Sequence, residues 1–102
     1  MVRTVKLLAR TARHVFPPKD PAERRVAYAV DWTDRLAGDD LASSTFELPS
    51  GLIAENASNT AKVATVQISG GAAGQAYEIT NRVTTAAGAE LQQVIRLRVK
   101  TR

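Results

Sequence analysis

The sequence predicts an all-β fold, a sandwich of two packed antiparallel sheets. Apolar and polar residues alternate through most segments after residue 25, the pattern of strands with one buried face. Turn residues interrupt these segments at short intervals, and no convincing helical period follows residue 25. About six short strands joined in this way are typical of an immunoglobulin-like sandwich. The chain has no cysteine, so it lacks the disulfide that joins the two sheets of antibody domains.

The first two strands are expected at residues 28–32 and 41–48, with an acidic turn between them. Apolar residues recur at every second position, as Phe46 and Leu48 do in the second strand. A Pro-Ser-Gly turn at residues 49–51 then ends this strand.

Four further strands are expected, at residues 52–56, 63–68, 76–85 and 91–100. The glycine-rich residues 69–74 predict a hairpin turn rather than a phosphate-binding loop, because no Gly-Lys-Ser/Thr ending and no helix follows. The alternation predicts a core made mainly of Tyr28, Val30 or Trp32, Phe46, Leu48, Val66, Ile68, Tyr77, Ile79, Val83, Ile95, Leu97 and Val99.

Residues 1–25 are expected to form a basic arm outside the sandwich. Apolar residues in segment 2–15 recur every three to four positions, which predicts a short helix or an extended arm that orders on a partner. Pro17, Pro18 and Pro21 would end such a helix and form a stiff connection. We therefore expect an arm and proline-rich connection at residues 1–25 and a sandwich domain at residues 26–102.

The positive charge of the chain is concentrated in this arm. Residues 1–25 carry seven basic and two acidic residues, a net charge of +5, whereas residues 26–102 carry seven basic and eight acidic residues, a net charge of −1. A basic arm is compatible with nucleic acid, an anionic membrane or an acidic protein surface, and charge alone does not distinguish them. No apolar run is long enough to span a membrane or to form a signal peptide, so synthesis in the cytoplasm is expected.

Few residues suggest catalysis or ligand binding. His14 is the single histidine and lies far along the sequence from any cluster of carboxylates, so we expect no enzyme and no cofactor. An acidic cluster around the turn at residues 31–40 leaves calcium binding as an alternative, although its spacing differs from the helix–loop–helix calcium site. Trp32 is expected in the core, with a sugar-stacking platform as the alternative.

A stripe of cations is expected on the outer face of the last strand. Arg96, Arg98, Lys100 and Arg102 alternate with apolar residues, which places them about 6.5 to 7 Å apart. Three roles remain open for the stripe: a solvated strand whose charges prevent edge-to-edge aggregation, contact with an acidic partner, or contact with a phosphate backbone.

Several short motifs resemble a family of small proteins of tailed bacteriophages, the fibre–tail adaptor or minor virion proteins. The resemblance spans roughly residues 19–100. The motifs that carry it are Lys19-Asp20-Pro21, Asp31-Trp32, Gly38-Asp39, Ser43-Ser44-Thr45-Phe46, Pro49-Ser50-Gly51-Leu52, Ser58-Asn59-Thr60-Ala61, Ser69-Gly70-Gly71 and the run from Tyr77 to Thr85.

This resemblance implies a non-enzymatic virion protein that docks on the tail or neck and connects it to fibres or neighbouring components. The implied partners are other virion proteins in a symmetric, multi-copy assembly, without membrane and with nucleic acid disfavoured. A capsid decoration protein, a carbohydrate- or calcium-binding sandwich and a nucleic-acid-binding module are the alternatives. The expected partner-binding residues are Arg3, Lys6, Arg10 and Arg13 in the arm and Arg96, Arg98 and Lys100 on the last strand.

Overall fold

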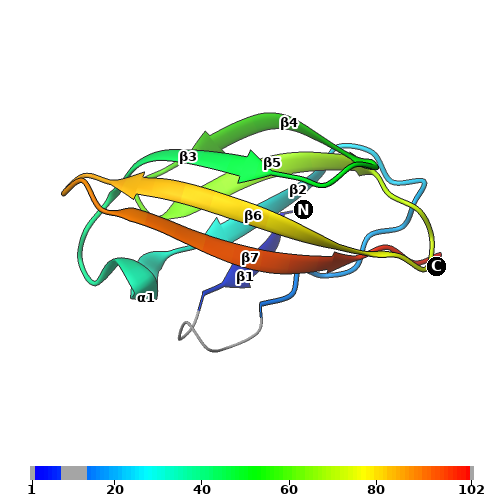
Figure 1. Cartoon of the computed structure of the whole chain (residues 1–102), viewed down its shortest axis with the longest axis horizontal. Coiled ribbons are helices and arrows are strands. Elements are labelled where there is room, and N and C mark those ends of the chain that lie inside the picture. The colour runs from blue at the N-terminus through cyan, green and yellow to red at the C-terminus, as the bar shows by residue number, and fades with distance from the viewer. Residues whose placement is uncertain (1, 8–13, 102) are drawn as a thin grey trace.

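The chain folds as a sandwich of two β-sheets in a computed structural model, which describes residues 2–7 and 14–101 (Figure 1). A single helical turn, α1 (Thr33–Leu36), accompanies the strands. The strands are β1 (Arg3–Lys6), β2 (Val26–Asp31), β3 (Leu41–Glu47), β4 (Leu52–Asn59), β5 (Val63–Gly70), β6 (Ala76–Thr85) and β7 (Glu90–Arg98). Within the described residues, no helix has the length and apolarity to span a membrane.

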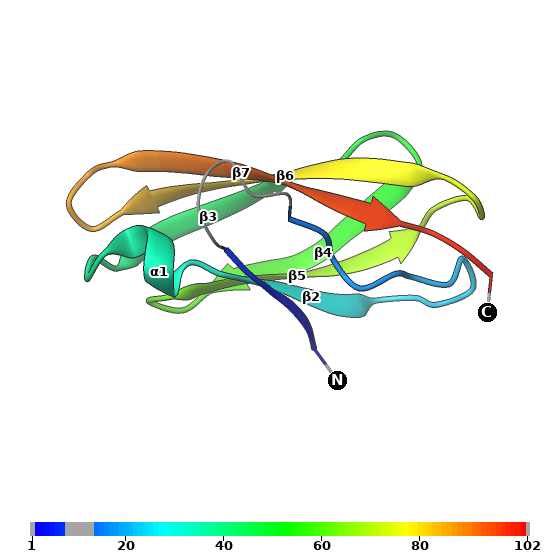
Figure 2. The same ribbon diagram turned by 90° about the horizontal axis from the view of Figure 1, so that it is seen from below.

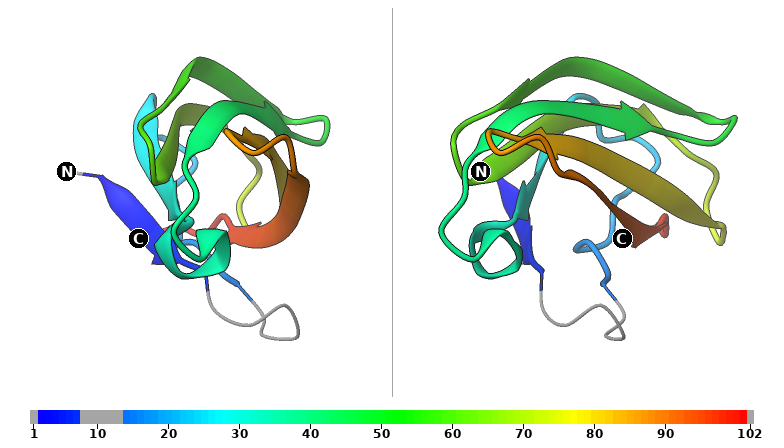
Figure 3. Two further views of the ribbon diagram at one scale, coloured as in Figure 1. Left: turned by 90° about the vertical axis from the view of Figure 1, so that its left-hand side faces the viewer. Right: turned by 60° about the vertical axis from the view of Figure 1, so that its left-hand side comes forward.

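The two sheets have the strand orders β1-β2-β5-β4 and β3-β6-β7. These orders correspond to the four-stranded and three-stranded sheets of the constant-type immunoglobulin fold. Neighbouring strands are antiparallel except β1 and β2, which run parallel. Views from below and along the long axis show two layers around a common interior (Figures 2 and 3). The predicted all-β immunoglobulin-like sandwich is therefore confirmed.

All six predicted strands are present, with modest differences at their ends. β6 has the predicted bounds, whereas β4 continues to Asn59 and β2 begins earlier, at Val26. A bulge interrupts the pairing of β4 with β5 after Glu55. The turn α1 was not predicted, because four residues are too few to produce a helical period.

The sequence predicted a hairpin turn at the glycine-rich residues 69–74, but the connection after β5 is not a hairpin. β5 and β6 belong to different sheets, so residues 71–75 cross from one layer to the other. A Cβ atom on Gly71 would lie 2.7 Å from a methyl carbon of Val99, and the φ angle of Gly71 is +96°. The Tyr77 hydroxyl accepts a hydrogen bond from the backbone N–H of Ala72 at 2.9 Å. This bond across the corner resembles the tyrosine corner of immunoglobulin-like domains.

The predicted core residues all lie in or against the hydrophobic core. Trp32 is fully buried, and its indole N–H donates a hydrogen bond to the side-chain oxygen of Asn81 at 2.8 Å. The sugar-stacking alternative is therefore wrong. Seven buried apolar residues were not in the predicted core, which are Leu7, Phe16, Ala29, Leu36, Leu41, Leu52 and Ala64.

The described part of the N-terminal segment contributes to the sandwich. Residues 3–6 form a strand rather than the helix that was one of the two expectations, and residues 8–13 of that expected helix lie outside the described residues. β1 extends the first sheet beside β2, and Leu7 is fully buried at the end of this strand. Residues 14–19 then run beside β7, where Phe16 is 1% exposed (Figure 2). Side chains in β1 alternate between half-buried and exposed, so the local period is two rather than 3.6. An isolated short helix is only marginally stable in water, whereas this segment gains backbone hydrogen bonds by pairing with the edges of β2 and β7.

Candidate interaction surface

The cations predicted to bind a partner occupy different environments. Arg10, Arg13 and Arg102 lie outside the described residues. Arg3 and Lys6 lie on β1, whereas the other three cations follow one another on and after β7.

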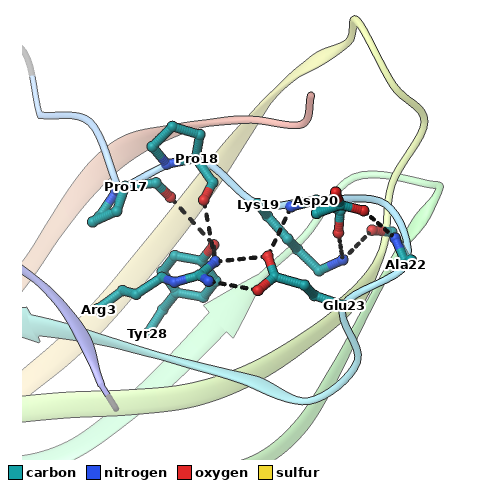
Figure 4. A network of polar contacts seen from close by, with 9 residues as sticks. Arg3, Pro17, Pro18, Lys19, Asp20, Ala22, Glu23 and Tyr28 are labelled. Atoms are coloured by element: carbon teal, nitrogen blue, oxygen red, sulfur yellow. Dashed lines mark hydrogen bonds and ion pairs between the residues drawn. The ribbon is translucent and has the colours of Figure 1, made fainter. Parts of the chain in front are cut away.

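Arg3 holds the N-terminal strand against the rest of the fold (Figure 4). Its guanidinium donates hydrogen bonds to the two carboxylate oxygens of Glu23, at 2.7 and 3.2 Å. It also donates to the hydroxyl of Tyr28 and to the carbonyl of Pro18, both at 3.1 Å. The hydrogen bond with Glu23 is the main reason that the pKa of Arg3 is raised. Arg3, with its side chain 17% exposed, therefore stabilises the fold and is poorly placed to meet a partner.

Lys19 forms a second internal contact that the sequence analysis did not identify. Its side chain is fully buried, and its ammonium donates to the carbonyl oxygens of Asp20 at 2.9 Å and Gly70 at 2.8 Å (Figure 4). Burial lowers the pKa of Lys19. The contact with Gly70 joins the N-terminal segment to the crossing between the sheets. Its position in the Lys19-Asp20-Pro21 motif was the single sequence feature that could have indicated a special role.

Lys6 pairs with Asp34 of α1 at 3.7 Å, and both side chains are more than half exposed. Such a pair is screened by solvent and contributes little to stability. Lys6 therefore lies at the surface but faces a carboxylate of its own chain.

The acidic turn is organised by hydrogen bonds. Asp31 accepts hydrogen bonds from the backbone N–H and hydroxyl of Thr33, at 2.9 and 2.6 Å, and the hydroxyl bond is the main cause of its lowered pKa. The ammonium of Lys62 lies 3.0 Å from the carboxylate of Asp40. Gly38 takes a φ angle of +94° in this turn. Across residues 2–7 and 14–101, no group of three or more histidine, cysteine or acidic side chains has a metal-binding arrangement.

The remaining three cations of the predicted set lie on β7 and just after it, and they point outward. Arg96, Arg98 and Lys100 are exposed and alternate with the buried Ile95, Leu97 and Val99. The structure thus confirms the orientation expected for this stripe. None of the three takes part in an ion pair with another described residue.

A hollow of about 800 Å³ lies over this stripe, between β7 and the N-terminal segment. The segment is fixed there by backbone hydrogen bonds from Phe16 N–H to the Arg96 carbonyl and from Arg96 N–H to the His14 carbonyl, each 2.9 Å. The hollow also includes two exposed apolar side chains, Val15 and Val94, which are 54% and 41% exposed. His14 also lines the hollow and is largely buried, and burial is the main cause of its lowered pKa.

Residues 19–98 match a protein family described as the podophage GP4 fiber-tail adaptor protein gp77. The chain belongs to this family. The match confirms the resemblance to phage fibre–tail adaptors and begins at the buried Lys19. A comparison with curated proteins finds no match.

Among solved structures, the chain resembles the solution structure of the PKD domain from KIAA 1837 protein. The two sequences are 21% identical, the TM-score is 0.54, and the similarity covers 88% of this chain and 82% of that one. This likeness supports the immunoglobulin-like fold alone. The family match therefore carries the functional argument.

Proposed function

We propose that the protein is a non-enzymatic structural component of a phage virion, which docks on the tail or neck and connects it to fibres or neighbouring components. The match of residues 19–98 to a fibre–tail adaptor family carries this proposal. The partners would be tail, neck or fibre subunits, in a symmetric assembly with several copies of this chain. We expect the protein to be made in the host cytoplasm and to remain in the finished particle.

The structure is compatible with this role. Two packed sheets form a rigid scaffold whose faces, edges and loops are available for protein contacts. Arg3 and Lys19 hold the N-terminal segment against the sandwich, so the surfaces beside that segment keep a defined geometry. An adaptor benefits from this rigidity, because less conformational entropy is lost when it binds.

The proposal is tested by a nonsense mutation in the gene of this protein, with infection of suppressor and non-suppressor hosts. We expect particles from the non-suppressor host to have filled capsids but to lack fibres or to have incomplete tails in electron cryomicroscopy. Expression of the intact chain from a plasmid should restore them. Particles with normal tails and a defect restricted to the capsid surface would instead identify a capsid decoration protein.

Copy number provides an independent measurement. Quantitative mass spectrometry of purified particles should give a ratio of this chain to the tail proteins that matches the rotational symmetry of the tail. A ratio that follows the major capsid protein would contradict the proposal.

A further inference from the structure

We propose that the hollow beside β7 binds an extended acidic segment of another virion protein, with Arg96, Arg98 and Lys100 contacting its carboxylates. The inference rests on the proposed function only for the origin of that segment. The hollow, its charge and its shape are properties of this chain alone.

The stripe of Arg96, Arg98 and Lys100 carries charge that no ion pair compensates among the described residues. Ion pairs neutralise cations elsewhere in the described structure, as Arg25 with Glu55 at 3.5 Å and Arg82 with Glu47 at 2.8 Å illustrate. The three cations of the stripe have no such partner among residues 2–7 and 14–101, even though Glu78 is in register with Arg96 on β6. A surface of this kind favours an acidic partner through charge complementarity.

The spacing of the cations matches that of an extended peptide. Alternate residues on a strand lie about 6.5 to 7 Å apart, so the stripe repeats at that distance. An extended acidic segment presents carboxylates at the same interval from every second residue. Its carboxylates can therefore face successive cations without bending of either chain.

The hollow also has an apolar part. Val15 and Val94 are both exposed beside the cations, and an apolar side chain of a peptide can cover them. A phosphate backbone has no apolar side chain with which to cover them, and the carboxylate of Glu78, also in the hollow, can accept a hydrogen bond from a peptide N–H. These features favour a peptide segment over a nucleic acid.

The adjacent edge indicates how the segment lies. Residues 14–19 lie along the edge of β7, where Val15 pairs with Arg96 and Lys19 with Val99. Pro17 and Pro18 in that segment have no N–H to donate to a further strand. The bound segment should therefore lie over the face of β7 rather than extend the sheet.

A second copy of this chain is a poorer candidate for the occupant. Several of its exposed carboxylates already face cations of the same chain, such as Asp34 with Lys6 and Asp40 with Lys62. Binding through these carboxylates would require breaking such pairs. A different protein with an acidic segment does not carry this cost.

The test uses the full-length protein labelled with ¹⁵N and a synthetic peptide of alternating glutamate and valine. We expect chemical-shift changes that saturate and that map to residues 14–18 and 94–100. The triple variant Arg96→Glu/Arg98→Glu/Lys100→Glu should lower the affinity by about tenfold or more. A control variant, Lys6→Glu/Arg24→Glu/Arg25→Glu, changes the net charge equally and should bind within about twofold of the wild type. Thermal melting of both variants establishes that they are folded.

Four outcomes would overturn the inference: no saturable binding, shift changes centred on Lys6 and Arg24, equal losses in both variants, or tighter binding of a DNA duplex at the same ionic strength. Binding of a peptide of alternating lysine and valine at the same site would also contradict it. The nonsense mutation tests the proposed function separately. Particles that carry this chain on the tail, together with wild-type binding by the stripe variant, would reject the hollow and leave the adaptor role intact.

Discussion

Arg3 of β1 and the arginines of β7 look alike in the sequence but have opposite environments in the structure. Arg3 is surrounded by a carboxylate, a hydroxyl and a carbonyl that all accept its hydrogen bonds. Arg96 and Arg98 stand on a strand of similar alternation but face solvent with no ion-pair partner among the described residues. The role of a cation therefore depends on the acceptors that the fold brings to it. Arg3 is expected to stabilise the fold, whereas Arg96 and Arg98 are expected to bind a partner.

The strongest test of this difference is deletion of residues 1–18. We expect the truncated chain to lose its cooperative fold, because the deletion removes β1, Leu7 and Phe16, and each buried apolar side chain is worth about 2 to 5 kcal/mol. That sum approaches the whole stability of a small domain, about 5 to 15 kcal/mol. Circular dichroism and NMR dispersion measure the outcome.

Deletion of residues 1–2 alone is the matched control and should leave melting nearly unchanged, since Val2 is exposed. This expectation reverses the boundary predicted from the sequence. A truncated chain that melts cooperatively near the wild-type temperature would restore residues 26–102 as an independent domain.

A smaller effect is expected from a single substitution in the same segment. Phe16→Ala should lower the free energy of unfolding by about 3 to 5 kcal/mol, because Phe16 is 1% exposed and packs against Tyr28 with ring centroids 4.8 Å apart. Val15→Ala, at the exposed neighbouring position, should change it by less than about 0.5 kcal/mol. Urea denaturation of both variants gives the values, and equal effects would show that the segment does not pack as described.

The two cations of β1, Arg3 and Lys6, should differ in their contribution to the free energy of unfolding. Arg3→Met should cost about 1 to 3 kcal/mol, since it removes the hydrogen bonds that Arg3 donates to the Glu23 carboxylate and the Tyr28 hydroxyl. Lys6→Met removes only an exposed pair and should cost about 0.5 kcal/mol or less. A double-mutant cycle of Arg3→Met with Glu23→Gln measures the coupling. Independent effects of the two substitutions would mean that the contact does not stabilise the fold.

The acidic turn predicts a pH dependence. The pKa of Asp31 is lowered in the folded chain, so its hydrogen bonds stabilise the fold above the ordinary aspartate pKa of about 3.9, and this contribution is lost as the pH falls toward the folded value. Thr33→Ala removes the hydroxyl donor and should raise the pKa of Asp31. The loss of stability at neutral pH should be about 0.5 to 1 kcal/mol. Carboxyl NMR titration and denaturation at pH 7 and pH 3 measure both effects, and an unchanged pKa would contradict the assignment.

The smallest effect on folding is expected for the cations of β7. The variant Arg96→Glu/Arg98→Glu/Lys100→Glu should change the free energy of unfolding by less than about 1 kcal/mol, because exposed charges without partners contribute little to stability. Thermal melting at low and high salt measures this change. A large loss of stability would place these residues with Arg3 as structural cations.

Local sequence pattern was sufficient for most of the sandwich. Strands such as β6 and β7 alternate with a period of two, and a buried face follows from that period without knowledge of the neighbouring strand. The same alternation placed Arg96 and Arg98 outside and Ile95 inside. Trp32 was assigned to the core because a small sandwich needs a large anchor, and its hydrogen bond with Asn81 completes that role.

Long-range pairing decided the rest. Whether the segment after β5 returns to the same sheet or crosses to the other depends on which strand it meets, and nothing within residues 69–74 specifies that choice. Likewise, segment 2–15 has apolar residues that suit either a helix or an extended chain, and in its described part the edges of β2 and β7 select extended pairing. Lys19 could be recognised as buried only when Gly70, distant in sequence, supplied an acceptor. Periodicity is a property of neighbouring residues, whereas burial of a charge and pairing of an edge depend on groups that only the folded chain brings together.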